Sequence, residues 1–137
     1  MKNILVIIII LISVFTVKLQ AQISVISNKS VNESVNQATL ANIYTMVYTK
    51  FSSGSKVVVI DNNESSIRGK FYSYIGKDPN SVKKEWLKKQ LTGEGKAPET
   101  LNSDEEVVNK VASTPGAIGY VKSESVNKNV KVLLEIK

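Results

Sequence analysis

The sequence contains no cysteine and no histidine, and only three of its 137 residues are proline. Without thiols and imidazoles the chain cannot form a disulfide, a zinc site of the cysteine and histidine type, or the common nucleophile and base pairs of hydrolases. No internal repeat or low-complexity tract appears. We therefore expect a protein that is not an enzyme and that has no metal and no cofactor.

The acidic residues do not restore these functions. Asp104, Glu105 and Glu106 fall at the expected start of a helix, where carboxylates complement the helix dipole. Asp61 and Glu64 lie close together, but their segment lacks the spacing and the glycine of a calcium loop. The sequence therefore predicts no catalytic residue and no metal ligand.

The charge balance is mildly basic, with a net charge of +6 for the full chain. Lys2 and Lys18 belong to the first 21 residues, which leaves 16 basic and 12 acidic side chains in the remainder. The lysines are scattered, with no aromatic residues interleaved, so we expect no nucleic-acid partner.

The first 21 residues have the layout of a secretory signal peptide. A charged start is followed by an apolar stretch from Ile4 to Val17 and then by Lys18 and Ala21. About fourteen apolar residues are fewer than the roughly 20 that span a bilayer, although an uncleaved anchor remains the alternative. We expect cleavage before Gln22, no lipid attachment because cysteine is absent, no stable membrane anchor, and a location in the periplasm or outside the cell. Residues 22–137 then have the size of one domain.

Hydrophobic spacing predicts alternating strands and helices along residues 22–137. Strands are expected at residues 23–27, 57–60, 117–121 and 130–136. Four helices are expected between them, and their inward faces carry Leu40, Ile43, Tyr44 and Val47; Ile67, Phe71 and Ile75; Val82, Trp86 and Leu87; and Val107, Val108, Val111 and Ala112. This order favours an α/β sandwich with a mainly parallel sheet covered by helices.

Several helix ends are marked by local signals. Asp78 can cap a helix that has Pro79 in its first turn, and Ser103 with Glu106 forms a capping box. In residues 113–121, Pro115 stops the preceding helix and Gly116 can adopt the positive φ of a helix end. Gly119 allows another backbone or a ligand to approach the following strand.

One segment has the composition of a ligand site. Residues 62–68 follow a strand and open a helix, so free backbone amides and the positive end of the dipole are expected there. Ser65 and Ser66 add hydroxyl donors, and Arg68 adds a charged fork that suits a tetrahedral oxyanion. The alternative is that Ser65 only caps the helix and that Arg68 pairs with Glu64 on the surface.

Four segments together resemble a known family. They are Leu40-x-x-Ile43-Tyr44, the strand Lys56 to Ile60, the run Ser65-Ser66-Ile67-Arg68-Gly69-Lys70-Phe71, and Trp86 followed by Leu91-Thr92-Gly93-Glu94-Gly95-Lys96-Ala97-Pro98. Their order is similar to that in substrate-binding proteins of phosphate ABC importers, and most closely to the short, periplasmic-binding-protein-like chains of that family. The resemblance covers roughly residues 23 to 121.

The resemblance implies an α/β fold with a single periplasmic-binding-protein-like lobe, in which helices flank a mainly parallel mixed sheet. It also implies that Ser65, Ser66 and Arg68 bind phosphate or a related oxyanion, and that an ABC permease or another envelope protein is the partner. Two features depart from the family: Asp61 stands where an arginine is usual, and Ser65-Ser66-Ile67 stands for Ser-Gly-Thr. A second lobe has no room in this length. An envelope interaction module without a small-molecule ligand therefore remains the alternative.

Overall fold

The computed structural model describes residues 22–137, so the signal peptide expected at residues 1–21 lies outside the described part. The elements, in chain order, are β1 (Ile23–Ser27), α2 (Gln37–Tyr44), β2 (Val58–Asn62), α3 (Ser65–Tyr74), α4 (Pro79–Leu91), β3 (Glu99–Leu101), α5 (Asp104–Ser113), β4 (Ala117–Lys122), the 3₁₀ turn η1 (Ser123–Ser125) and β5 (Lys131–Ile136).

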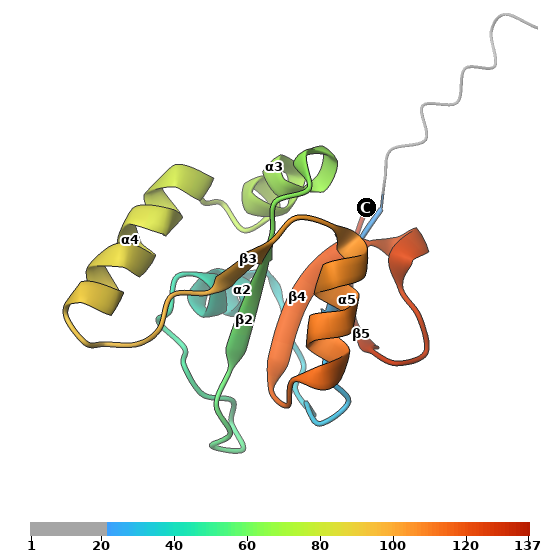
Figure 1. The fold of residues 1–137 in the computed structure, drawn as a ribbon, viewed down its shortest axis with the longest axis horizontal. Helices are drawn as coiled ribbons and strands as arrows, with labels where there is room; N and C mark the ends of the chain where they lie inside the picture. The colour runs from blue at the N-terminus through green and yellow to red at the C-terminus, as the bar shows by residue number, and fades with distance from the viewer. Residues whose placement is uncertain (1–21) are drawn as a thin grey trace, which may run out of the picture.

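The strands form one sheet in the order β3-β2-β4-β1-β5. β2 pairs in parallel with β3 and with β4, whereas β1 is antiparallel to β4 and to β5. Four strands therefore run in one direction and β1 runs in the other. In Figure 1, α5 covers the front face of the sheet and α2 lies behind the sheet, while α3 lies at the upper end of the sheet and α4 at its left side. The predicted α/β fold with a mainly parallel mixed sheet flanked by helices is confirmed.

Two hydrophobic cores lie on the two faces of the sheet. Along β4, Ile118 and Tyr120 enter the larger core, which contains the buried side chains of α2, α3 and α4. Ala117 and Val121 enter the smaller core, which α5 closes with its valines. Because successive side chains of a strand point to opposite faces, β4 belongs to both cores. β4 therefore carries apolar side chains on both of its faces, because helices cover both faces of the sheet.

Two glycines are required by close approach of other atoms. A side-chain carbon at Gly119 would lie 3.0 Å from Val107 Cγ1 and 3.2 Å from Val111 Cγ2, so glycine lets α5 pack closely on β4. Gly116 has φ of +78°, and a side-chain carbon there would overlap the carbonyl oxygen of Lys56. A close approach at Gly119 was predicted, but the atoms that approach are valine side chains of α5 and not a backbone or a ligand.

The predicted helix caps are also confirmed. The Asp78 side chain accepts a hydrogen bond from Ser81 N at 3.0 Å, and Ser103 Oγ accepts one from Glu106 N at 3.2 Å. The Glu106 carboxylate returns to the amide of Asn102 rather than to that of Ser103. These contacts satisfy amides that have no partner inside the helix.

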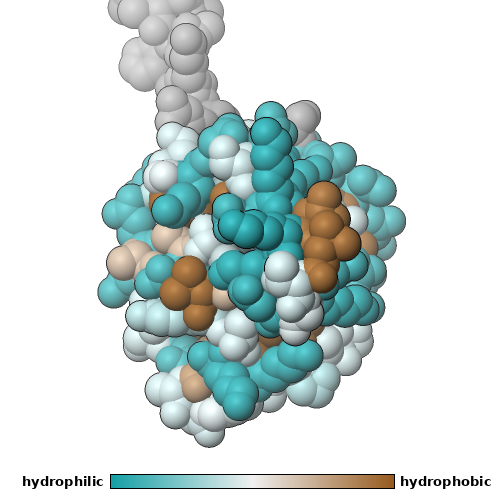
Figure 2. Space-filling model, turned by 90° about the vertical axis from the view of Figure 1, so that its left-hand side faces the viewer, coloured by the Kyte–Doolittle hydropathy of each residue, from teal (hydrophilic) through white to brown (hydrophobic). Residues whose placement is uncertain are grey.

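Two predictions of buried side chains are wrong. Val47 is 59% exposed because α2 ends at Tyr44, and Met46 follows with φ of +60°. Leu87 is 58% exposed because α4 contacts the core mainly through Val82 and Trp86. Figure 2 looks at the side of the molecule that carries α4 and shows separate hydrophobic patches on a largely hydrophilic face. Within residues 22–137 no helix has both the length and the apolar character needed to cross a bilayer.

Candidate functional site at the carboxyl end of β2

The predicted oxyanion segment lies where β2 ends and α3 begins. β2 finishes at Asn62, and α3 starts three residues later at Ser65. The first turn of α5 and the end of β4 lie beside it, since Asn62 Nδ2 donates to Asp104 Oδ1 at 2.9 Å and to the carbonyl of Tyr120 at 3.0 Å. In open α/β sheets, ligands bind at the carboxyl ends of the strands. The segment therefore lies at the edge where this fold class places ligands.

The amino end of α3 holds a carboxylate of the protein itself. Glu64 is the N-cap residue, and its side chain accepts hydrogen bonds from the backbone N–H of Ser66 at 3.4 Å and from the Ser66 hydroxyl. Lys122 Nζ lies 3.5 Å from Glu64 Oε2. The Ser66 hydroxyl, more than any other contact, lowers the pKa of Glu64, and Lys122 adds to this effect. The end of α3 thus stabilises negative charge, as the helix dipole predicts.

Arg68 points from α3 toward the end of β2. Its Nη1 lies 2.6 Å from Asp61 Oδ2 and donates a longer bond to the carbonyl of Asn62 at 3.4 Å. Its guanidinium also lies over the ring of Tyr72, 5.2 Å from the centroid. Burial by itself lowers the pKa of Arg68, but the charge of Asp61 offsets this and the net shift is upward. Arg68 is therefore charged and held in an ion pair.

Asp61 is fully buried, and four side chains donate hydrogen bonds to it. Besides Arg68, these are the hydroxyls of Tyr120 at 2.8 Å, Tyr72 at 3.0 Å and Thr100 at 3.3 Å. Burial, and then the charge of Asp61, raises the pKa of both tyrosines well above its ordinary value. Both phenols are therefore neutral donors at physiological pH. A buried carboxylate with this many donors meets the condition for burying charge in a protein.

One polar atom of this cluster has no partner. Arg68 Nη2 is buried and makes no hydrogen bond among the described residues. A buried guanidinium nitrogen without a partner is costly and calls for an explanation. It is a donor that an added oxygen atom would satisfy.

Asp104 lies in the first turn of α5, as predicted, and its carboxylate also makes contacts that the sequence did not predict. Its Oδ2 accepts bonds from the backbone amide of Lys122 at 3.0 Å and from the Ser125 hydroxyl at 2.8 Å. Together with its bond from Asn62, these contacts join α5 to the ends of β2 and β4. Asp104 fixes the geometry of the strand ends.

The structure brings the predicted residues to one helix end but pairs them differently from the prediction. Ser65 is the first residue of α3, and Ser66 donates to Glu64 instead of facing an empty site. Arg68 pairs with Asp61 and not with Glu64, which replaces the surface pairing considered as the alternative. The cluster around Asp61 was not predicted from the sequence. The sequence signal for this cluster is that Asp61 directly follows four consecutive apolar residues, 57–60, the last three of which belong to β2.

No family profile and no curated protein matches the sequence. A protein from Clostridium perfringens, described as a phosphate ABC transporter substrate-binding protein with bound phosphate, matches with a TM-score of 0.66 and 16% identity over 82% of this chain and 45% of that one. An ABC-type phosphate transport receptor from Vibrio cholerae matches with a TM-score of 0.63 and 18% identity, over 83% of this chain and 46% of that one. PstS from Borrelia burgdorferi matches with a TM-score of 0.59 and 18% identity, over 82% of this chain and 47% of that one.

The chain thus spans somewhat less than half the length of the solved proteins that it matches. At identities of 16% and 18% the likeness concerns the fold. The fold expected from the four sequence segments is therefore the one found, and the neighbours that share it are binding proteins of transport systems. The chain has the fold of a periplasmic-binding-protein-like domain, in the form found in phosphate ABC transporter substrate-binding proteins.

Proposed function

We propose that the mature chain, residues 22–137, is an exported lobe that binds phosphate or a similar oxyanion at the amino end of α3. Ser65, Ser66 and Arg68 are its ligand residues, and an ABC permease or another envelope protein receives the loaded lobe. The observation that carries the proposal is the carboxylate of Glu64, which the Ser66 amide and hydroxyl already bind. A position that holds one oxyanion of the protein suits an oxyanion from solution.

The proposal requires the Glu64 side chain to move aside. Glu64 is partly exposed and close to Lys122, so its carboxylate can turn toward that lysine when a ligand enters. The incoming oxyanion would then meet the Ser66 donors. It would also reach Nη2 of Arg68, which is buried and without a hydrogen bond among residues 22–137, if the guanidinium turns toward the helix end. Arg68 would bind it as a charged fork while Nη1 stays on Asp61.

The charges of the site argue for weak binding. Arg68 and Lys122 are balanced by Asp61 and Glu64, so the site offers no net positive charge to phosphate. A single lobe also cannot enclose the ion and exclude water. We expect a dissociation constant of about 1 mM or weaker for phosphate, which a second lobe, chain or partner would improve.

The test is a phosphate titration of residues 22–137, followed by backbone amide chemical shifts. We expect the amides of Ser65, Ser66 and Arg68 to shift with phosphate. Glu64→Gln should bind about tenfold more tightly, because the resident charge no longer competes. Glu85→Gln is the matched control, since it removes the same charge from the exposed surface of α4 and should bind as the unmodified chain does.

Two further variants complete the test. Ser66→Ala should weaken binding, and Arg68→Lys should weaken it more, because lysine keeps the charge but loses the fork. If Glu64→Gln gains no affinity and phosphate leaves the α3 amides unmoved, the oxyanion proposal is wrong. Export is tested separately by mass spectrometry of the protein produced in a bacterial host, where we expect a mature chain that starts at Gln22.

A further inference from the structure

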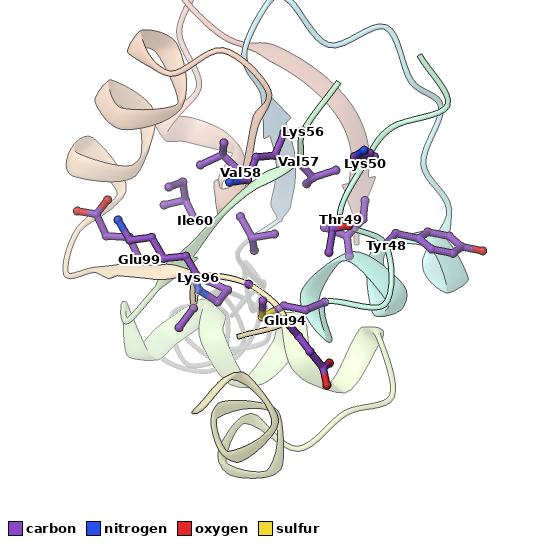
Figure 3. Close-up of a pocket in the computed structure, with 16 residues that line it drawn as sticks. Tyr48, Thr49, Lys50, Lys56, Val57, Val58, Ile60, Glu94, Lys96 and Glu99 are labelled. Atoms are coloured by element: carbon purple, nitrogen blue, oxygen red, sulfur yellow. The ribbon is translucent and has the colours of Figure 1, made fainter. Parts of the chain in front are cut away.

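A cavity of about 490 Å³ opens at the amino end of β2, away from the cluster around Asp61. Its walls come from three separate parts of the chain: residues 43–50 at and after the end of α2, residues 56–60 at the start of β2, and residues 94–99 before and at the start of β3. This volume lies within the range of about 300–1,000 Å³ that small-molecule sites occupy. Figure 3 shows the side chains that surround it.

The cavity exists because the outer edge of β2 is covered at both ends but not in the middle. Before the strand, Lys50 pairs with Lys56, and Val57 N donates to Thr49 O at 3.0 Å. β3 joins β2 only from Ile60 onward. The open edge is thus limited to two valines, Val58 and Val59. An added β-strand needs a longer edge, so the opening suits a compact ligand and not an extended peptide.

The floor of the cavity is mainly apolar. It is formed by Ile43, Val59 and Ala97, which pack on the side of the larger core, and by Pro98, while Val58 borders it from the other face of the strand edge. Each of these side chains is buried or half-buried. An apolar floor of this kind binds hydrocarbon and gives little to a small hydrated ion such as phosphate.

Met46 and Gly95 close the side of the cavity nearest α4. A side-chain carbon at Gly95 would lie 2.8 Å from Met46 Cε, so the absence of a side chain lets the loop lie against the methionine. Met46 itself has φ of +60°, which is uncommon for a residue other than glycine. Uncommon backbone conformations of this kind are found preferentially at ligand sites.

The rim of the cavity is positively charged. Lys50, Lys56 and Lys96 are exposed lining residues, and none of the ion pairs among residues 22–137 involves them. Of the two acidic lining residues, Glu99 is paired with Lys110 at 3.4 Å. Figure 3 shows the carboxylate of the other, Glu94, directed away from β2, and the three lysines placed around the valine side chains.

We propose that this cavity binds a small amphipathic anion, with an apolar body of medium-chain length against the valine edge and a carboxylate or similar headgroup among the three lysines. The apolar floor excludes a bare inorganic ion, and the short open edge excludes a strand of a partner protein. The three unpaired ammonium groups select a negative headgroup over a neutral one. The site is separate from the one at α3 and does not depend on it.

Octanoate is the probe, and residues 22–137 are the protein. We expect octanoate to shift the amides of Val58, Val59, Gly95 and Lys96, with a dissociation constant of about 0.1–1 mM for a ligand of this size. Octan-1-ol, which has the same chain without the charge, should bind at least about fivefold more weakly. Ala97→Phe fills the floor and should remove the shifts produced by both compounds.

Matched lysine variants test the headgroup contact. The triple change Lys50→Gln, Lys56→Gln and Lys96→Gln should weaken octanoate about tenfold and leave octan-1-ol unchanged. The control triple Lys83→Gln, Lys84→Gln and Lys88→Gln removes the same charge from α4 and should leave both unchanged. All six lysines are exposed, so we expect every variant to fold.

Three results would overturn the proposal. The first is an octanoate shift pattern that lies elsewhere on the protein, the second is equal binding of octanoate and octan-1-ol, and the third is equal weakening by the two lysine triples. Binding of octanoate by Glu64→Gln should match that of the unmodified chain. The outcome at this cavity is therefore distinguishable from the outcome of the phosphate titration.

Discussion

The two ends of β2 differ in how their charged groups are partnered, although the strand has only five residues. At the carboxyl end, Asp61 is fully buried and accepts four hydrogen bonds from side chains. At the amino end, an open cavity of about 490 Å³ is bordered by Lys50, Lys56 and Lys96, which form no ion pair within residues 22–137. A ligand at the first end must displace a side chain of the protein, whereas a ligand at the second end enters free space.

The difference follows from what each end of the strand meets. The carboxyl end lies under the first turns of α3 and α5, and both helices supply polar side chains that reach it. The amino end lies between a tight hairpin and a loop, and neither is long enough to cover the edge of the strand. The carboxyl end of β2 is therefore covered and held by hydrogen bonds, whereas part of its edge at the amino end stays accessible.

Among the variants at the two ends of β2, the replacement of Asp61 should cause the largest loss of stability. Asp61→Asn keeps the shape but leaves the buried guanidinium of Arg68 without its counter-charge. We expect the free energy of unfolding in urea to fall by about 3–5 kcal/mol. The double variant Asp61→Asn with Arg68→Met should recover more than half of this loss, and a loss below about 1 kcal/mol in the single variant would contradict the assigned role.

Gly116→Ala should be the next largest change, and it acts at the amino end of β2. The new side-chain carbon would overlap the Lys56 carbonyl, and alanine disfavours the positive φ at this position. The Gly116 carbonyl also accepts the bond from Val58 N at 3.0 Å. We expect a loss of about 1–3 kcal/mol in chemical denaturation.

Gly69→Ala is the matched control for this glycine. Gly69 lies inside α3, and a side-chain carbon there meets no atom within 4 Å. Alanine should therefore stabilise the protein by about 0.5–1 kcal/mol, because it favours the helix. Equal losses in the two variants would show that the contact with Lys56 is unimportant.

A smaller effect is expected from the pH dependence of Glu64. Because its pKa is lowered in the folded chain, Glu64 contributes stability above its unfolded pKa of about 4.3 and loses this contribution as the pH falls through the folded value. Glu64→Gln should reduce the free energy of unfolding at pH 7 by about 0.3–1 kcal/mol. The two proteins should converge in acid, and a difference that grows on acidification would contradict this.

Leu87→Ser should have the smallest effect and provides the baseline. Leu87 is 58% exposed on α4, away from both ends of β2. We expect the free energy of unfolding, measured by thermal denaturation, to change by no more than about 0.5 kcal/mol. A clearly larger loss would indicate that the exposed face of α4 packs against something in solution.

Much of the fold could be predicted because local signals and periodicity agreed. Ser103, Asp78 and Pro79 mark helix starts by their own chemistry, and these predictions were confirmed. The prediction failed at Val47 and Leu87, where a hydrophobic residue continued a helical stripe that the structure does not bury. Periodicity gives the direction of a side chain, but it does not tell where the helix ends or whether a neighbour covers that face.

The candidate site was predicted only in part. Composition brought Ser65, Ser66 and Arg68 together as oxyanion donors, and α3 does begin there. Composition did not predict that Glu64 would cap the helix with its side chain or that Arg68 would turn toward Asp61. Thr100 and Tyr120 are about 40 and 60 residues further along the chain, so their convergence on Asp61 depends on the pairing of β2 with β3 and β4.

The sequence by itself determined the alternation of strands and helices except for the short strand β3, which was not predicted. It also determined the caps, the glycines at Gly116 and Gly119, and the absence of thiol and imidazole chemistry, because these properties reside in single residues or in their close neighbours. The tertiary structure alone decided which charges are paired and which are free. Parallel pairing joins segments that are far apart in the chain, and it buries one end of β2 under two helices while it leaves the other end open between a hairpin and a loop.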